Sequence, residues 1–331
     1  MKAIHMTQTG EAADALRLVE VAEPEITQAT QIKVALQAAG VNPIDTKLRR
    51  GGLFFEQALP AILGCDGAGT VVATGAAVTK FKSGDRVWFC NGGLGADPGN
   101  YAQYTVLDQR WAAPMPATLD FEHAAAGPLV LITAWGALYD RGRLQSGQTV
   151  LIHAGAGGVG HVAIQLAKLR GAKVFTTVGN EKNADFVRAL GADEVVNYTQ
   201  QDFVAVVNEL TGGEGVDMVL ESIGHEVFNR SIECTRQFGD IVTLLDFDTR
   251  ALKEARMRNL RLGFELMLTP QLRKLDAARD QQVDILNHCA GLIDNGQLRL
   301  QVAQVLPLDQ ALAAHRLQET GHTAGKIVLK T

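Results

Sequence analysis

Strand-like and helix-like hydrophobic patterns alternate through the central part of the chain. The run TVLIHAG at 149–155 is short, apolar and ends in glycine, and the following VGHVAIQLAKLRGA spaces its apolar residues three and four apart until Gly171. Further strand-like runs, with helical patterns between them, lie at 172–179, 193–198, 215–222 and 239–246. This alternation predicts a doubly wound parallel sheet covered by helices.

The first third of the chain has a different pattern. Segments such as QIKVALQAAGV, GAGTVVATG and DRVWFC have strand lengths and are separated by glycine-containing turns, and helical patterns become regular only near residue 120. A mostly β region therefore precedes the alternating one. Because 331 residues can bury two cores, we expect an α/β protein of two domains.

Composition and charge exclude several classes of partner. The chain is 47% hydrophobic and 20% charged, and its formal net charge of -5 comes without any block of lysine and arginine. A nucleic acid or an anionic membrane is therefore not an expected partner. The first residues turn polar too soon for a secretory signal peptide, so a cytoplasmic location is expected.

The longest apolar run and the cysteines also carry information. The run at 124–139 is shorter than a membrane span and contains Gly127, Pro128 and Gly136, so it predicts buried helix and turn. The four cysteines are far apart and form no CxxC pair, which indicates reduced thiols and no cysteine-rich zinc lobe.

Between the first central strand and its helix, Gly155, Gly157 and Gly160 form a G-x-G-x-x-G pattern. The first glycine permits a sharp turn, the second lets a diphosphate approach the backbone, and the third lets helix and strand pack closely. The helix N-terminus adds free N–H groups and the positive end of its dipole. The predicted dinucleotide-binding residues of this turn are Gly155, Ala156, Gly157, Gly158, Val159 and Gly160.

The end of the second strand favours NADPH over NADH. An NAD site commonly has an acidic residue there, but no acid stands at Val178 or Gly179. Asn180 and Lys182 are placed to receive a 2′-phosphate, with Gly179 beside them. The alternative is that Lys182 is only a solvated charge in the first turn of a helix, and Glu181 partly opposes a phosphate.

Five ordered motifs carry a resemblance to a known family: GVNPID at 40–45, LGCDGAGTVVATG at 63–75, FKSGDRVW at 81–88, GAGGVG at 155–160 and GKIVL at 325–329. With them the chain resembles the medium-chain dehydrogenase/reductase superfamily, and within it the zinc-free quinone oxidoreductases and enone reductases. The resemblance implies a GroES-like, mostly β catalytic domain of residues 1–120 completed by 297–331. A Rossmann domain of residues 121–296 would bind NADP, with the active site in the cleft between the domains.

The resemblance also implies that no metal takes part. Zinc-dependent members have a cysteine where this chain has Asn42, and a GHE motif where it has Cys65 and Asp66. The third ligand position falls near Leu129. Because a catalytic zinc needs three protein ligands and an open position, one thiol and one carboxylate are too few.

By family analogy, Asn42, Asp45 and Lys47 are the predicted catalytic residues, near the nicotinamide. Lys47 can hold the ribose or donate a hydrogen bond to the developing enolate. The alternative for Asn42 and Asp45 is turn formation and helix capping in N-P-x-D. Cys65 is predicted to border the substrate pocket, or to be a small buried apolar residue.

The remaining predicted cofactor contacts also follow from the resemblance. Thr133 is expected near the nicotinamide, or only as a helix cap, and Tyr198 near the adenine and its phosphate, or only over the sheet edge. The backbones after the fourth and fifth strands are expected to line the cofactor groove at Ser222, Ile223, Leu245 and Asp246.

Three functions stay open at this point. The first is zinc-independent hydride transfer from NADPH to a quinone or an α,β-unsaturated carbonyl compound, and the second is reduction of an enoyl thioester or another activated alkene. The third is an NADPH-binding protein with a structural or RNA-binding role, which the acidic composition disfavours. The alternating, apolar segment 259–268 predicts an edge strand through which a homodimer forms, or an edge that a helix of the same chain covers.

Overall fold

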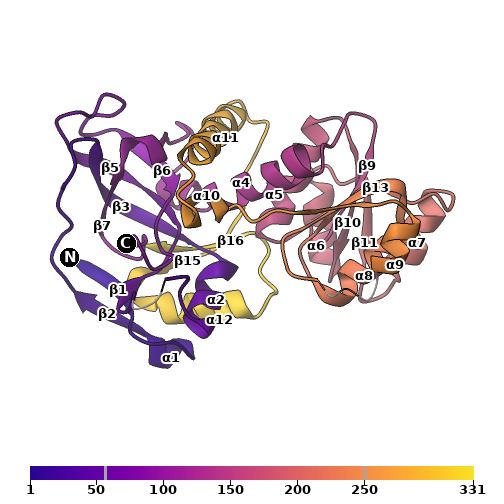
Figure 1. Cartoon of the computed structure of the whole chain (residues 1–331), viewed down its shortest axis with the longest axis horizontal. Coiled ribbons are helices and arrows are strands. Elements are labelled where there is room, and N and C mark those ends of the chain that lie inside the picture. The colour runs from indigo at the N-terminus through magenta and orange to yellow at the C-terminus, as the bar shows by residue number, and fades with distance from the viewer. Residues whose placement is uncertain (56–57, 248, 250–251) are drawn as a thin grey trace. The chain divides into compact units, whose positions relative to one another are not determined.

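The computed structural model describes residues 1–55, 58–247, 249 and 252–331 (Figure 1). The chain forms two compact units, of which the first comprises residues 1–130 and 268–331 and the second residues 131–267. The sequence predicted boundaries at residues 120 and 296 instead. The segment 268–296 lies in the first unit because its helix α11 (Asp276–Asp294) packs on β8 (Ala113–Pro114) and on the 3-10 turn η1 (Gln109–Trp111).

The first unit is mostly β, as its turn-punctuated pattern predicts. Within the described residues, a sheet of seven strands has the order β15-β16-β3-β5-β6-β8, with β7 also paired to β3, and a smaller sheet has the order β2-β1-β4. The strands not yet bounded are β1 (Lys2–Met6), β2 (Leu16–Glu20), β3 (Gln31–Val41), β4 (Ala61–Ile62), β5 (Asp66–Thr74), β6 (Arg86–Cys90), β7 (Tyr104–Asp108), β15 (Val302–Pro307) and β16 (Lys326–Lys330).

Alternation along β3 explains the core of this unit. Ile32, Val34 and Leu36 are buried on one face and pack with Val71 and Phe89 of β5 and β6, whereas the residues between them are only half-buried. Short helices surround the sheets: α1 (Ala12–Ala15), α2 (Pro43–Gly51), α3 (Phe121–Ala125), α10 (Thr269–Leu272), α12 (Ala311–Glu319) and the turn η3 (Leu308–Gln310).

The second unit has the predicted parallel sheet. Within the described residues its six strands have the order β11-β10-β9-β12-β13-β14, so that the strand order reverses between β9 and β12. The strands are β9 (Thr149–Ile152), β10 (Lys173–Val178), β11 (Glu194–Asn197), β12 (Val216–Glu221), β13 (Thr235–Thr243) and β14 (Arg261–Phe264). A doubly wound sheet binds its ligand at such a reversal, outside the carboxyl ends of the strands.

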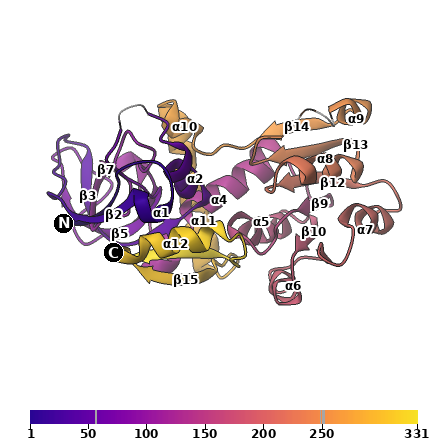
Figure 2. The same ribbon diagram turned by 90° about the horizontal axis from the view of Figure 1, so that it is seen from below.

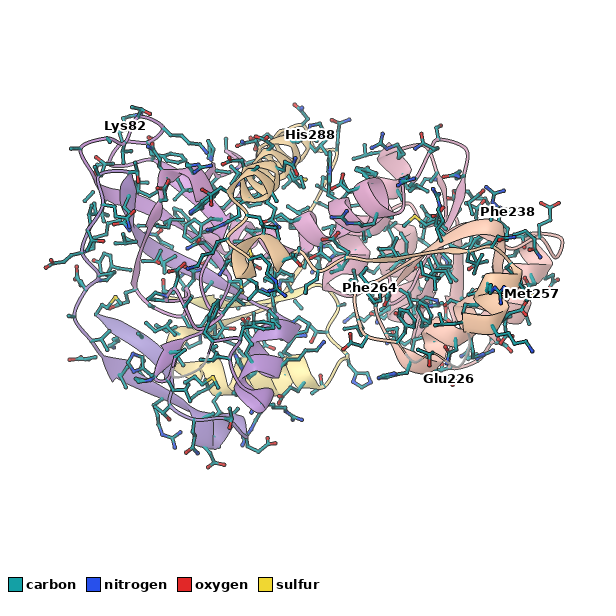
Figure 3. All side chains as sticks on the ribbon, viewed as in Figure 1. Lys82, Glu226, Phe238, Met257, Phe264 and His288 are labelled. Carbon is teal, nitrogen blue, oxygen red and sulfur yellow. The ribbon has the colours of Figure 1, made fainter. Side chains whose placement is uncertain are left out.

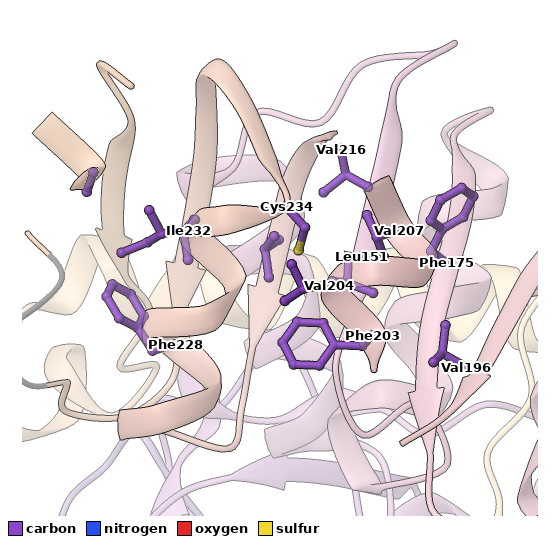
Figure 4. Close-up of a cluster of buried hydrophobic side chains, with 13 residues drawn as sticks. Leu151, Phe175, Val196, Phe203, Val204, Val207, Val216, Phe228, Ile232 and Cys234 are labelled. Atoms are coloured by element: carbon purple, nitrogen blue, oxygen red, sulfur yellow. The ribbon is translucent and has the colours of Figure 1, made fainter. Parts of the chain in front are cut away.

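Helices cover both faces of this sheet. Side chains of α7 (Phe203–Leu210), α8 (His225–Glu233) and α9 (Leu252–Met257) pack with strand residues such as Leu151 and Phe175 in one core cluster (Figure 4). Right-handed crossovers on the other side of the reversal put α5 (Gly158–Leu169) and α6 (Glu181–Arg188) on the opposite face. The segment α4 (Pro128–Trp135) continues as a π-helical turn, η2 (Gly136–Arg141), in agreement with buried helix at 124–139.

Two strand predictions differ from the structure in their bounds. β13 starts at Thr235 and ends at Thr243, whereas the apolar pattern predicted 239–246, because the strand begins with the polar residues TRQ and has a register irregularity against β12. β14 covers only Arg261–Phe264 of the predicted 259–268. It lies at the edge of its sheet, beside β13 (Figure 2). No helix of the described residues is long and apolar enough to cross a membrane.

Candidate functional site

The glycine-rich turn connects β9 to α5 at the carboxyl end of the sheet, where the strand order reverses. A Cβ atom at Gly155 would lie 2.0 Å from Thr176 Oγ1, and one at Gly160 would lie 2.2 Å from Ala154 O, so packing alone requires both glycines. A Cβ at Gly157 would meet only atoms of Ala154, its carbonyl oxygen at 3.2 Å and its Cβ at 4.0 Å. Gly157 therefore keeps open space beside the turn, as a closely approaching ligand requires.

The N-terminus of α5 leaves its first N–H groups for a ligand. Gly157 is the N-cap, and no side chain hydrogen-bonds at that cap. Ala156 is buried, whereas Gly158 and Val159 are half-buried. A turn without side chains, followed by the positive end of a helix of twelve residues, fits a diphosphate group.

The end of β10 places the predicted phosphate-selecting residues at the start of α6. Asn180 is the N-cap, and its Oδ1 accepts from Asn183 N at 2.9 Å, while Lys182 is exposed in the first turn. Tyr198 is 57% exposed, and a Cβ at Gly179 would lie 2.7 Å from its hydroxyl oxygen. The glycine and the tyrosine are therefore neighbours at the carboxyl ends of β10 and β11, and the lysine follows in the first turn of α6.

The loops after β12 and β13 lie at the same end of the parallel sheet as the glycine turn. Glu221, at the end of β12, accepts from Ile223 N and Gly224 N at 2.6 Å each and from Thr243 Oγ1 at 2.8 Å. Ser222 Oγ donates to His153 O at 3.3 Å. Ser222 is half-buried and Ile223 is exposed; of the other two predicted groove residues, Leu245 is half-buried and Asp246 is exposed. Thr133 is buried inside the helical segment 128–141, away from either end.

In the first unit, the predicted catalytic residues lie at the N-terminus of α2. Asn42 is the N-cap and Pro43 the first helical residue, and Asp45 Oδ2 accepts from Asn42 N at 2.8 Å. Asn42 and Asp45 are fully buried, whereas Lys47 is exposed on the helix. The structure thus contains the capping role that N-P-x-D suggested, and of the three side chains only that of Lys47 faces solvent.

A charged network that sequence reasoning did not assemble surrounds Asn42. Its Nδ2 donates to Asp66 Oδ2 at 2.9 Å, and Lys326 Nζ donates to Asn42 Oδ1 and, at 2.8 Å, to Val41 O. Lys326 Nζ lies 3.8 Å from Asp66 Oδ2, and both residues are buried. Asp66 Oδ1 accepts from Leu129 N at 2.8 Å. Lys326 belongs to the quoted GKIVL motif, where a lysine in an otherwise apolar strand signals a buried charge in need of a partner.

Burial governs the pKa values of this network. It raises the pKa of Asp66, against the opposing effects of Lys326 and Asn42, and lowers the pKa of Lys326, against the attraction of Asp66. Burial likewise raises the pKa of Asp45 to about 7, although Asn42 N–H and, at 2.9 Å, the Tyr101 hydroxyl donate to its Oδ2. Asp45 Oδ1 is buried and has no hydrogen-bond partner among the described residues, which suits the protonated carboxyl better than the ionised one.

Cys65 is fully buried beside this network. Its thiol donates to Cys90, and the Cys90 thiol donates to the carboxylate of Asp66. The hydrogen bond to Cys90 together with burial raises the pKa of Cys65 well above its usual value. The described residues contain no group of three His, Cys, Asp or Glu side chains able to hold a metal ion. The Lys326 ammonium, which is buried beside Asp66, would moreover repel a dication there.

The chain is similar to known oxidoreductases over nearly its whole length. The model of the alcohol dehydrogenase GroES-like domain matches residues 28–117, and that of the zinc-binding dehydrogenase matches residues 190–329. Quinone oxidoreductase 1 of Escherichia coli (strain K12) is 34% identical over 92% of this chain and 96% of its own, and 2-haloacrylate reductase of a Burkholderia species is 32% identical over 90% of each. The solved structure of Escherichia coli quinone oxidoreductase complexed with NADPH has a TM-score of 0.89 and 31% identity, and the match covers 100% of both chains.

Proposed function

Because the chain belongs to the medium-chain dehydrogenase/reductase superfamily, in its quinone oxidoreductase branch, we propose that it uses NADPH to reduce a quinone or an α,β-unsaturated carbonyl compound without a zinc ion. The chain is an NADPH-dependent oxidoreductase. The observation that carries the cofactor assignment is the glycine turn before α5, whose open Gly157 and uncapped helix N-terminus fit a diphosphate.

The residues of the second unit hold the dinucleotide in this proposal. Backbone N–H groups at 158–160 bind the diphosphate in the space beside Gly157, and Lys182 and Asn180 receive the 2′-phosphate, with Tyr198 beside the adenine. The loops after β12 and β13, with Thr133, line the nicotinamide half of the groove. When bound, NADPH supplies a hydride for the electron-poor carbon of the acceptor.

In the first unit we assign distinct roles to the three residues of the N-P-x-D-x-K segment. Reduction of the acceptor places negative charge on its oxygen, and a positioned donor at that oxygen stabilises it. Lys47 is exposed and cationic, so it is the side chain of α2 that can donate there. Asn42 and Asp45, which are buried, hold the start of the helix that carries Lys47.

Zinc independence rests on the donor set. The buried ammonium of Lys326 and the amide of Asn42 stand beside Asp66; the ammonium has no lone pair for a cation, and the amide ligates one less readily than a thiolate or a neutral imidazole does. Without a Lewis acid, acceptors that take up hydride readily are favoured, namely quinones and activated alkenes. The similarity to 2-haloacrylate reductase, whose name denotes an activated alkene, also supports an alkene acceptor as a second candidate.

The test is a substrate panel followed by oxidation of NADPH. The purified protein is assayed with a naphthoquinone, an aliphatic enone, an enoyl thioester and a saturated aldehyde, with and without exhaustive chelation, and its metal content is measured. Turnover of the quinone or the enone, unaffected by chelation, is expected, and Lys47→Met should lower kcat. Activity confined to the aldehyde, or lost with a stoichiometric metal, would contradict the proposal.

We also propose a homodimer formed through β14. The strand lies at a sheet edge, where unpaired backbone groups favour pairing with a second copy. Phe264 is 56% exposed on this strand, and Phe238 and Met257, labelled with it in Figure 3, are apolar residues of the same unit that are exposed by 69% and 70%. Sedimentation equilibrium should give twice the chain mass of 35.5 kDa, and a monomer across micromolar concentrations would exclude the dimer.

A further inference from the structure

A chain of hydrogen bonds between buried groups connects the glycine turn to two neighbouring elements of the second unit. His153 follows β9 directly and is 2% exposed. Its Nδ1 lies 3.2 Å from Thr177 Oγ1 of β10, and its Nε2 lies 3.0 Å from Ser231 Oγ of α8. Thr177 and Ser231 are buried as well. The imidazole therefore uses both ring nitrogens inside the unit, and it makes a T-shaped contact with the Phe203 ring.

The partners of these hydroxyl groups determine where the histidine proton lies. Ser231 Oγ donates its one hydrogen to Val227 O at 2.6 Å, so toward His153 it can only accept. His153 Nε2 must then carry the proton, and Nδ1 must be the acceptor. Thr177 Oγ1 in turn donates to Nδ1, which leaves its oxygen to accept from Ala154 N at 3.1 Å.

The direction of the whole chain follows from this assignment. Ala154 N–H donates to Thr177, Thr177 to His153, His153 to Ser231, and Ser231 to the carbonyl of Val227. Each of the three side chains between these ends donates one hydrogen bond and accepts one, so the series is complete only with a neutral imidazole. Burial lowers the pKa of His153 to about 3, which agrees with a neutral ring at physiological pH.

One end of this series of hydrogen bonds is Ala154, the residue that shapes the diphosphate-binding turn. Ala154 has a φ of +51°, a left-handed conformation that is unfavourable for a residue with a Cβ and persists only when neighbouring contacts hold it. Its carbonyl oxygen accepts from Gly157 N at 2.9 Å and lies against Gly160. The orientation of Ala154 therefore sets the positions of Gly157 and of the N–H groups that follow it.

We propose that His153, as the tautomer protonated at Nε2, is a positioning residue for NADPH, which holds Ala154 in its left-handed conformation through Thr177 and ties the turn to α8 through Ser231. It touches neither the cofactor nor the acceptor. The inference rests on the proposed binding of NADPH at this turn. It adds that the affinity of the turn depends on neutral side chains buried behind it, and that the apoprotein is already arranged for the ligand.

The binding test compares matched substitutions of threonine in the second unit. Thr177→Val removes both the donor to His153 and the acceptor for Ala154 N. NADPH affinity, measured by quenching of protein fluorescence, should fall about five- to tenfold, with kcat at saturating NADPH changed less than about twofold. Thr177→Ser restores the hydroxyl and should recover the affinity. The control is Thr235→Val, because the hydroxyl of buried Thr235 donates at 2.7 Å to the backbone carbonyl of Ser231, which is not one of the groups that link Ala154 to Val227.

The proton test is measured on the wild-type apoprotein, and a variant serves only to assign the resonance. Long-range proton–nitrogen spectra of the protein labelled with ¹⁵N-histidine, with the resonance assigned by its loss in His153→Gln, should show the Nε2-protonated tautomer unchanged from pH 5 to 8. The opposite tautomer, or a titration in that range, overturns the inference, as does equal NADPH affinity of Thr177→Val and wild type. Failure of the wild type to bind NADPH would instead refute the proposed function itself.

Discussion

The N-terminus of α2 in the first unit and the turn before α5 in the second are both positioned by buried polar side chains, but by side chains of different kinds. At α2 the groups are ionisable, namely Asp45, Asp66 and Lys326, and each is buried. At the turn before α5 they are His153, Thr177 and Ser231, with a neutral imidazole. Loss of its partner destabilises the fold far more for a buried charge than for a buried hydroxyl group.

Because of this difference, we expect substitutions in the two regions to have different effects. The charges of this network are balanced within the protein, because the ammonium of Lys326 faces the carboxylate of Asp66, and burial raises the pKa of Asp45 to about 7, which keeps that carboxyl protonated below neutral pH. At the turn, the uncharged side chains hydrogen-bond to one another, and the first backbone N–H groups of α5 stay available for a ligand. Substitutions in the first region should therefore act mainly on stability, and those in the second mainly on the affinity for NADPH.

The largest effect is expected from Lys326→Met. This substitution leaves Asp66 buried without its counter-charge, and breaking a buried pair costs about 3–5 kcal/mol of the free energy of unfolding. Urea unfolding monitored by Trp88, which is buried in the first unit, measures the loss. The double variant Lys326→Met/Asp66→Asn removes both charges and should recover most of the stability. A double variant as unstable as the single one would show that the ion pair is not what holds α2.

The next effect is a pH dependence from Asp45. Its folded pKa, raised to about 7 by burial, lies above the value of roughly 3.9 in an unfolded chain, so between these values the folded state binds the extra proton. Relative to Asp45→Asn, the wild type should be most stable below pH 4 and lose roughly 1.4 kcal/mol per pH unit as the pH rises toward 7. Unfolding curves of the two proteins at several pH values give this difference, and parallel stability profiles would contradict the raised pKa.

How far the sequence predicts these two regions differs for a physical reason. The glycine turn is local, since its strand, glycines and helix are contiguous, and the pattern at 149–171 predicts both the elements and their order. The network at α2 joins residues 42, 66 and 326, which no local pattern connects. Asn42 and Asp45 were therefore predicted as site residues by analogy, while their partner Lys326 was found only from the fold.

Element bounds show the same limit on a smaller scale. The start of β13 was missed because the residues TRQ are polar, although β12 and β14 pair with this strand on either side. The first predicted domain boundary lies ten residues before that of the contact-defined units, whereas α11 had no sequence signal that assigned it to the first unit. Which sheet a helix covers depends on contacts between distant segments, and a single sequence shows only the apolar face of the helix.

The turn before α5 can be tested with Gly157→Val. The φ of -73° suits any residue and a Cβ there meets only atoms of Ala154, the nearest at 3.2 Å, so the fold should persist. The branched side chain would instead occupy the space that we assign to the diphosphate. Because this would remove about two charge-assisted hydrogen bonds from backbone N–H groups to the diphosphate, NADPH affinity should fall roughly a hundredfold. The control is Gly291→Val, since Gly291 lies in α11 with open space around it. Retained affinity in Gly157→Val would place the phosphates elsewhere.

The smallest effect is expected from Lys182 in the second region, and it concerns the choice between NADPH and NADH. This side chain is exposed at the start of α6, so water screens its contact with a 2′-phosphate and the contact is worth less than those inside the turn. Lys182→Ala should raise the KM for NADPH about tenfold and leave that for NADH unchanged, because only NADPH has the phosphate. Arg188→Ala is the control, since Arg188 is a cation of the same helix that pairs with Asp185 at 3.1 Å. Glu181 stands beside Lys182, and Glu181→Gln should shift the preference modestly in the opposite direction, toward NADPH. If Lys182→Ala weakened both cofactors equally, the lysine would act on the turn or the helix rather than on the phosphate, and the selection of NADPH would have to come from Asn180 or from the backbone at Gly179.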